Sequence, residues 1–239
     1  MSGISSKEWA AFLEEINKAR HEIGDCGEVV WYRGQNSVNY PLLPNLLRYR
    51  NGTEKEKDLF TSFRKFGDKT IEKTQSEWET LFHMQHYGVP TRLLDWTETF
   101  GIALFFAVHN RRTESDDAAI FLLNPLKLNT LSSQKKLYVM PRDENMFSYT
   151  RVYFDHNPFD PNAPIAVEPA FVNSRMHAQR GVFTVHDNAL EPMEDRFPSV
   201  VRKVLLPQCL FSAAQEFLEL ANINEFSVYP DIGGLLRGA

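Results

Sequence analysis

The stretch that decides the fold is His83-Met-Gln-His-Tyr-Gly-Val-Pro-Thr-Arg-Leu-Leu-Asp-Trp-Thr97, which sets charged and polar side chains in a segment otherwise typical of a protein interior. Polar groups in an interior need partners or perform a task. A helix predicted over residues 69–87 ends inside this stretch, because Pro90 cannot continue a helix and biases the preceding residue towards extended geometry. A short strand or turn is then predicted over 92–96, followed by a buried helix over 97–110.

The segments on either side predict a mixture of helices and strands. Helices are expected at 7–20, 53–65 and 208–221, and strands are expected at 28–34, 118–123, 137–139, 165–167, 181–185 and 200–206. No repeat or linker divides the chain. The expected fold class is therefore α+β, a single domain with a central, mostly antiparallel or mixed sheet flanked by helices.

Composition narrows the class of protein. The chain has 239 residues, 43% of them hydrophobic, with a net charge of −5 and a pI near 5.8, which does not favour a general nucleic-acid or membrane surface. No apolar run approaches the roughly 20 residues that a membrane span needs. The N-terminus lacks a signal-peptide pattern, and Cys26 and Cys209 lack CxxC spacing. A soluble, reduced, cytoplasmic protein is expected, with no membrane partner.

Arg33 is the first candidate for ligand binding. It stands near the end of a predicted strand, where a guanidinium presents a planar fork to a phosphate or carboxylate. The following Gly34 would let a ligand approach the backbone. An equally open alternative is that Arg33 pairs with a core carboxylate such as Asp95.

The central stretch offers several further candidates, each with a structural alternative. His83 and His86 share a helix face, but no third ligand completes a metal site, so no metal is expected. His86 is instead expected to hold the 91–96 loop by hydrogen bonds. Arg92 and Asp95 could pair across that loop, and Trp96 could belong to the core.

Two groups of polar residues lie further along the chain. Arg175 and Gln179 are four residues apart, so a helical turn would place them on one side. Asn224-Glu225 and Pro230-Asp231 supply carboxylates near the C-terminal end. No Ser-His-Asp signature, GxSxG elbow, P-loop or GxGxxG motif is present.

Several motifs together resemble the FRG-domain family. They are Tyr-Arg-Gly-Gln at 32–35, His-Tyr-Gly-Val-Pro-Thr-Arg-Leu-Leu-Asp-Trp-Thr at 86–97 with Ala103-Leu-Phe-Phe-Ala107, Ser174-Arg-Met with Gln179-Arg-Gly-Val-Phe-Thr184, and Tyr-Pro-Asp-Ile-Gly-Gly at 229–234. The resemblance implies an FRG domain at 28–235. It is preceded at 1–27 by the amphipathic helix region that the apolar periodicity predicts, and it is followed by a C-terminal tail at 236–239. The resemblance names a family without specifying a reaction.

The order of motifs is also similar, more distantly, to that of ADP-ribosyltransferases. These enzymes often place Arg or His at the end of a first core strand, Ser or Thr on a strand that leads into a helix, and Glu or Gln before a later strand. Arg33, Thr97 and Gln179 follow the same order here. This similarity implies NAD as a substrate.

Cleavage of the bond between nicotinamide and ribose builds positive charge on the sugar, so a carboxylate near the ribose is useful. Arg33 would hold the pyrophosphate, and Trp96 or Tyr87 would stack on nicotinamide. Gln179 can position a hydroxyl but cannot neutralise a cation, which leaves Glu225 or Asp95 as the carboxylate.

The sequence thus predicts an NAD-consuming ADP-ribosyltransferase or NAD glycohydrolase acting as a toxin or phage-defence effector. Its partners would be a nucleotide ligand, a protein or nucleic-acid acceptor, and an antitoxin or other partner protein. The predicted catalytic residues are Arg33, His86, Gln179 and Glu225, and the predicted NAD-binding residues are Arg33, Gln35, Tyr87, Thr91, Arg92, Asp95, Trp96, Thr97 and Arg175.

Two alternatives remain open. A metal-independent nuclease would use His86 as general base, with Arg33 and Arg92 clamping the scissile phosphate. A noncatalytic module would use the same polar groups to bind a nucleotide or a partner.

Overall fold

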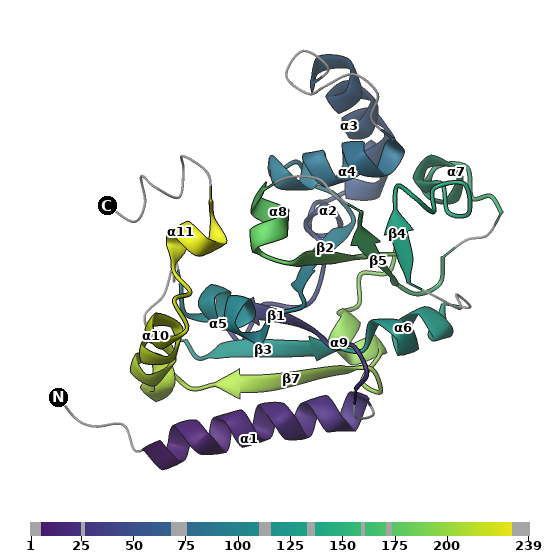
Figure 1. The fold of residues 1–239 in the computed structure, drawn as a ribbon. Helices are drawn as coiled ribbons and strands as arrows, with labels where there is room; N and C mark the ends of the chain where they lie inside the picture. Colours follow the sequence, from purple (N-terminus) through teal and green to yellow (C-terminus); the bar gives the residue numbers. More distant parts are fainter. Residues whose placement is uncertain are drawn as a thin grey trace.

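A seven-stranded sheet in the order β4-β5-β6-β2-β1-β3-β7 forms the centre of the protein in a computed structural model (Figure 1). The structure describes residues 6–24, 27–67, 76–109, 116–132, 137–158, 161–170 and 174–230. The strands are β1 (Trp31–Gln35), β2 (Leu93–Thr97), β3 (Ala118–Leu123), β4 (Tyr138–Met140), β5 (Ile165–Pro169), β6 (Gly181–Val185) and β7 (Val201–Leu206). Only β4 and β5 pair in parallel among them, which confirms the predicted α+β class.

Helices cover the sheet on both faces. They are α1 (Ser6–Ile23), α2 (Asn45–Arg48), α3 (Gly52–Gly67), α4 (Glu77–His86), α5 (Phe100–Val108), α6 (Pro125–Leu131), α7 (Tyr149–Tyr153), α8 (Ser174–Ala178), α9 (Met193–Arg196), the 3₁₀ turn η1 (Gln208–Leu210), α10 (Phe211–Leu220) and α11 (Glu225–Val228). Figure 1 shows α1 and α10 beside β3 and β7, with α3, α4 and α7 towards the β4–β5 end.

A capping box fixes the start of α4. The side chain of Ser76 accepts a hydrogen bond from the Glu79 backbone N–H at 3.0 Å, and the Glu79 carboxylate accepts from the Ser76 N–H at 2.9 Å. The helix gives way at Tyr87 to Gly88, whose φ of +75° favours glycine. The predicted helix over 69–87 is therefore shorter at its start, and residues 68–75 lie outside the described part of the chain.

The hydrophobic core is continuous on one face of the sheet and divided on the other. The continuous cluster includes Trp31 of β1, Trp96 of β2 and Phe121 of β3. On the opposite face one cluster packs α1, α5 and α10 against β1, β3 and β7, while a second packs α3, α4 and α7 against β2, β4, β5 and β6.

The division follows the junction of β1 with β2. These two strands pair at one position only, Tyr32 opposite Thr97, whereas β2 and β6 pair along five positions, from Leu93 opposite Val185 to Thr97 opposite Gly181. Beyond Tyr32 the two central strands separate. Backbone groups and side chains on both strands are thereby left facing a gap.

Gly34 is required by the close approach of α5 to β1. A Cβ atom built on Gly34 would lie 1.7 Å from the carbonyl oxygen of Ala103. Helix α5 therefore fills the side of Gly34 on which a Cβ would lie, while Gly34 also lines the cavity described below, so its predicted role in admitting a ligand stays a prediction.

Arg92 anchors the start of β2 to α3. The Arg92 side chain is 2% exposed, and its Nε donates to Glu56 Oε1 at 2.7 Å while its Nη2 donates to Glu56 Oε2. Its Nη1 donates to the carbonyl of His186 at 2.8 Å. Although burial alone would lower the pKa of Arg92, the hydrogen bonds that it donates to Glu56 raise it. The predicted pairing of Arg92 with Asp95 is wrong, because Arg92 is turned into the core towards Glu56.

Candidate functional site

A cavity of about 400 Å³ opens where β1 and β2 separate, and it is called the central cavity below. This volume lies in the range of about 300–1,000 Å³ that is common for small-molecule sites. The walls come from β1 and the segment after it, α2, α4, β2, α5, α8 and β6. Its polar and charged lining side chains include Arg33, Gln35, Asn36, Tyr40, Arg48, Gln85, His86, Asp95, Thr97, Arg175 and Gln179.

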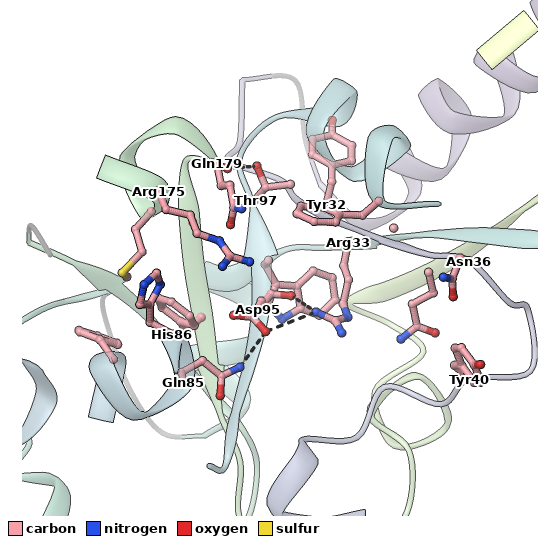
Figure 2. A pocket seen from close by; sticks show the side chains of 18 of the residues that line it. Tyr32, Arg33, Asn36, Tyr40, Gln85, His86, Asp95, Thr97, Arg175 and Gln179 are labelled. Atoms are coloured by element: carbon pink, nitrogen blue, oxygen red, sulfur yellow. Dashed lines mark hydrogen bonds and ion pairs between the residues drawn. The ribbon is translucent and has the colours of Figure 1, made fainter. Parts of the chain in front are cut away.

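Arg33 bridges the gap between the two central strands. Its Nη1 donates a hydrogen bond to the backbone carbonyl of Asp95 at 2.6 Å, where a regular sheet would have a backbone donor. The same Nη1 lies 3.9 Å from Asp95 Oδ2. Figure 2 shows Arg33 and Asp95 meeting at the centre of the site, with His86 and Arg175 on one side and Asn36 and Tyr40 on the other. Arg33 therefore both pairs with Asp95 and lines the central cavity.

Asp95 presents a carboxylate to the central cavity. Its side chain is 55% exposed, and its Oδ2 accepts a hydrogen bond from Gln85 Nε2 at 2.8 Å. Gln85 Oε1 in turn accepts from Thr91 Oγ1 at 2.5 Å. The Oδ1 atom of Asp95 has no hydrogen-bond partner among the residues that the structure describes, so it is available to a ligand.

Gln85, the residue before His86, makes hydrogen bonds to the 91–96 segment, and the hydrogen bonds predicted for His86 stay a prediction. Gln85 links α4 to Thr91 and to Asp95, while His86 lines the central cavity with its ring edge-on to Tyr87, at 5.0 Å between ring centres. Helix α4 therefore supplies both a brace for β2 and an imidazole to the cavity wall.

The charges that line the central cavity are mainly positive. Three arginines, Arg33, Arg48 and Arg175, face one carboxylate, Asp95, within the described part of the lining. Burial lowers the pKa of Arg33, and the charge of Arg48 lowers it further, while Asp95 opposes both effects. An arginine remains protonated under these conditions. The cavity thus favours an anionic ligand, although the chain as a whole is acidic.

The C-terminal part of the chain is tied to the rim of the cavity. Gln179 Nε2 donates to the carbonyl of Val228 at 3.2 Å, and the Gln179 carbonyl accepts from Thr97 Oγ1 at 2.7 Å. The guanidinium of Arg175 lies over the ring of Tyr229 at 4.6 Å. These contacts bring the 174–184 motif and the end of α11 to the strand that carries Thr97.

The structure places four of the predicted site residues outside the cavity lining. Thr91 and Arg92 are buried in the hydrogen bonds described above, and Tyr87 is 59% exposed at the end of α4, next to Phe63. Glu225 is paired with His109 Nε2 at 2.8 Å. These four side chains therefore do not line the cavity, their predicted roles at a ligand stay predictions, and Asp231 lies outside the described residues.

Trp96 also differs from its predicted role. It contributes to the cavity wall, but it is only 3% exposed and belongs to the continuous core cluster. Its Nε1 donates to Thr184 Oγ1 at 3.0 Å. A ring held in this way does not present a face for stacking on nicotinamide, so the core alternative is the correct one.

Several lining residues were not predicted. Asn36, Tyr40 and Arg48 come from the segment between β1 and α3, which the two prolines at 41 and 44 mark only as a connection. Gln85, which was also not predicted, lies next to His86 in the central motif. Gln35, which was predicted, is 5% exposed, and its Oε1 lacks a hydrogen-bond partner among the described residues.

No group of three His, Cys, Asp or Glu side chains in the described ranges is arranged to hold a metal ion. None of the described helices has the length and apolar character needed to cross a membrane.

The fold and site define an α+β protein with an arginine-lined cavity at the divergence of two central strands. Residues 28–116 match the family model of the FRG domain. The match includes β1, β2 and α5 and therefore carries Arg33, Asp95 and Thr97. The motifs at 174–184 and 229–234 lie beyond it. Neither the curated proteins nor the solved structures contain a match to the chain.

Proposed function

We propose that the central cavity binds NAD and that the protein cleaves the bond between nicotinamide and ribose, as an ADP-ribosyltransferase or an NAD glycohydrolase. The observation that carries this proposal is the convergence of three distant sequence positions. Arg33 on β1, Thr97 on β2 and Gln179 just before β6 line one cavity, and these three strands are consecutive in the sheet.

The charges of the cavity suit such a reaction. When the bond between the ribose C1′ and the nicotinamide nitrogen breaks, its electron pair leaves with nicotinamide and positive charge grows on the ribose. The carbon then forms a bond to a nucleophile, which is water in hydrolysis and an acceptor group in transfer. Arginines bind the pyrophosphate through charge-assisted hydrogen bonds, and a carboxylate stabilises the developing cation.

Asp95 takes the carboxylate role in this proposal in place of Glu225. It is the carboxylate within the described lining of the cavity, and its Oδ1 is open to a ligand. Gln179 would position a ribose hydroxyl, and His86 would accept a proton from the attacking nucleophile.

The test incubates the purified protein with NAD and measures the released nicotinamide by chromatography. Asp95→Asn should lower the rate about 100- to 1,000-fold, the usual loss when one transition-state electrostatic contact is removed. Glu225→Gln is the matched control and should retain the wild-type rate, because Glu225 pairs with His109 away from the cavity lining. A wild-type protein that releases no nicotinamide would refute the proposal, and so would an Asp95→Asn variant with full activity.

The nuclease alternative is less well supported by the geometry. His86 lines the cavity, but Arg92, which was predicted to clamp the phosphate, is buried against Glu56. Incubation of the same preparation with RNA and DNA tests it directly. Nucleic-acid cleavage that persists in Asp95→Asn but is lost in His86→Ala would favour the nuclease.

The proposed biological role is that of a cytoplasmic effector, a toxin or a phage-defence protein held in check by a partner protein. Consumption of NAD would arrest the growth of cells that express the chain. Growth arrest by the wild type, relieved by Asp95→Asn, is the expected result. Arrest that persists in cells with an undiminished NAD pool would contradict it.

A further inference from the structure

We infer that Arg33 and Arg48 together form a clamp for a diphosphate group, with Arg48 as the residue that distinguishes a diphosphate from a monophosphate. This inference rests on the proposed nucleotide-binding function and names the chemical group that the site reads. Arg48 lies on α2, between the motifs at 32–35 and 86–97 in sequence, and no motif includes it.

Arg48 is held in place before any ligand arrives. Its Nε donates to the carbonyl of Leu43 at 2.9 Å, and its Nη2 donates to the carbonyl of Pro41 at 3.1 Å. Both acceptors belong to the segment that connects β1 with α2. Its Nη1 has no acceptor among the described residues, while the side chain lines the central cavity. An arginine fixed by two backbone carbonyls loses little conformational entropy when it binds an anion.

Arg33 is the second cation and is also incompletely paired. Of the five N–H donors that a guanidinium carries, the described residues accept from Nη1 alone. Its Nε is buried and has no partner in the described part of the chain. An unpaired buried donor is destabilising, so the arrangement is better satisfied with a ligand present.

Arg33 and Arg48 face the single carboxylate of Asp95 in the described lining, so positive charge remains in excess. Asp95 Oδ2 is hydrogen-bonded to Gln85 and lies 3.9 Å from Arg33 Nη1, too far for a hydrogen bond. Arg48 acts on Arg33 as a like charge, which lowers the pKa of Arg33. An anion bound between the two guanidiniums would convert this repulsion into attraction on both sides.

Two separate forks suit two phosphate groups. Arg33 projects from β1 and Arg48 from α2, and each guanidinium can engage one phosphate through parallel hydrogen bonds. A cavity of about 400 Å³ also exceeds the space that a single phosphate would fill. A nucleoside diphosphate, as present in ADP-ribose and NAD, offers one phosphate to each arginine and is larger than a single phosphate.

The test is calorimetric titration of the full chain with ADP, AMP and inorganic pyrophosphate. The wild type should bind ADP at least about tenfold more tightly than AMP, because one additional charge-assisted hydrogen-bonded contact is worth about 1.5–3 kcal/mol. Arg48→Gln should bring the ADP-to-AMP affinity ratio close to one and abolish pyrophosphate binding. Arg50→Gln is the matched control, since Arg50 is an exposed arginine two residues away that does not line the cavity.

Arg48→Lys provides a second variant that keeps the positive charge and removes the planar fork. It should retain part of the preference for ADP, which shows that the loss in Arg48→Gln is not a folding defect. An unchanged ADP-to-AMP ratio in Arg48→Gln, or a wild type that binds ADP no better than AMP, would overturn the clamp.

The outcome also separates this inference from the proposed enzyme activity. Tight ADP binding that depends on Arg48, without nicotinamide release from NAD, would refute the proposed enzyme activity and support the diphosphate clamp. Nicotinamide release by Arg48→Gln with a wild-type KM for NAD would refute the diphosphate clamp and support the proposed enzyme activity.

Discussion

The buried pair of Glu56 and Arg92 gives the sharpest stability prediction. Glu56 is 4% exposed and Arg92 is 2% exposed, so neither group has appreciable access to water. The Glu56 carboxylate accepts hydrogen bonds from Arg92 Nε, from Arg92 Nη2 and from the Tyr149 hydroxyl. Glu56→Gln keeps the shape of the side chain but leaves the Arg92 cation facing a neutral amide.

Removal of one partner of a buried ion pair costs about 3–5 kcal/mol, because the remaining charge stays out of water. For a chain of this size, 1 kcal/mol shifts Tm by about 2–4 °C, so Glu56→Gln should lower Tm by roughly 6–20 °C. The free energy of unfolding would be measured by urea titration with circular dichroism. Asp58→Asn, an exposed carboxylate on the same helix, is the control and should change stability by less than about 0.5 kcal/mol.

The double variant Glu56→Leu with Arg92→Met distinguishes the charge effect from a simple loss of packing. Apolar replacement of both partners removes the unpaired cation, so it should cost less than Glu56→Gln alone. The reasoning would be refuted if Glu56→Gln stayed within about 1 kcal/mol of the wild type, or if the double variant were the less stable of the two.

Two further stability predictions concern Gly34 and His186. Gly34→Ala should abolish soluble, folded protein, because the added Cβ would lie 1.7 Å from the Ala103 carbonyl oxygen; Gly181→Ala, whose Cβ would come no closer than 3.6 Å to its neighbours, should fold normally by circular dichroism. Burial lowers the pKa of His186 from 6.5 to about 3, so between these values only the unfolded chain holds the proton. Stability should therefore decrease as pH falls below 6.5, by up to about 1.4 kcal/mol per unit from this group. Urea titrations at several pH values should show a shallower dependence in His186→Gln, and an identical slope would contradict this assignment.

Local patterns in the sequence were sufficient for most of the secondary structure. The β-branched and aromatic run before Arg33 forms β1, and the apolar run of 118–123 forms β3 with the predicted bounds. The start of α4 was missed, because its boundary depends on the capping box of Ser76 and Glu79 within a polar segment. The spacing of apolar residues shows which face of a helix is buried, but it does not show at which residue the helix is capped.

Partners distant in the chain could not be predicted in this way. Arg92 and Asp95 are three residues apart and of opposite charge, yet Arg92 pairs with Glu56, which lies on helix α3, 36 residues earlier. The strand alternation of β2 turns Arg92 and Asp95 in different directions, but a single sequence does not show which neighbour each one meets. Arg48 was missed for a similar reason, since only the tertiary fold brings α2 to the end of β1.

The divided packing around the central strands also bears on how the cavity could be altered. Its two walls rest on separate apolar clusters, one beneath α5 and one beneath α4, while a shared cluster behind the sheet spans both sides. A change in the side chains beneath one wall should therefore disturb mainly the packing of that wall. Substitutions beneath α5 or beneath α4 should therefore change the width of the cavity separately. The shared cluster on the other face of the sheet would hold the two halves together.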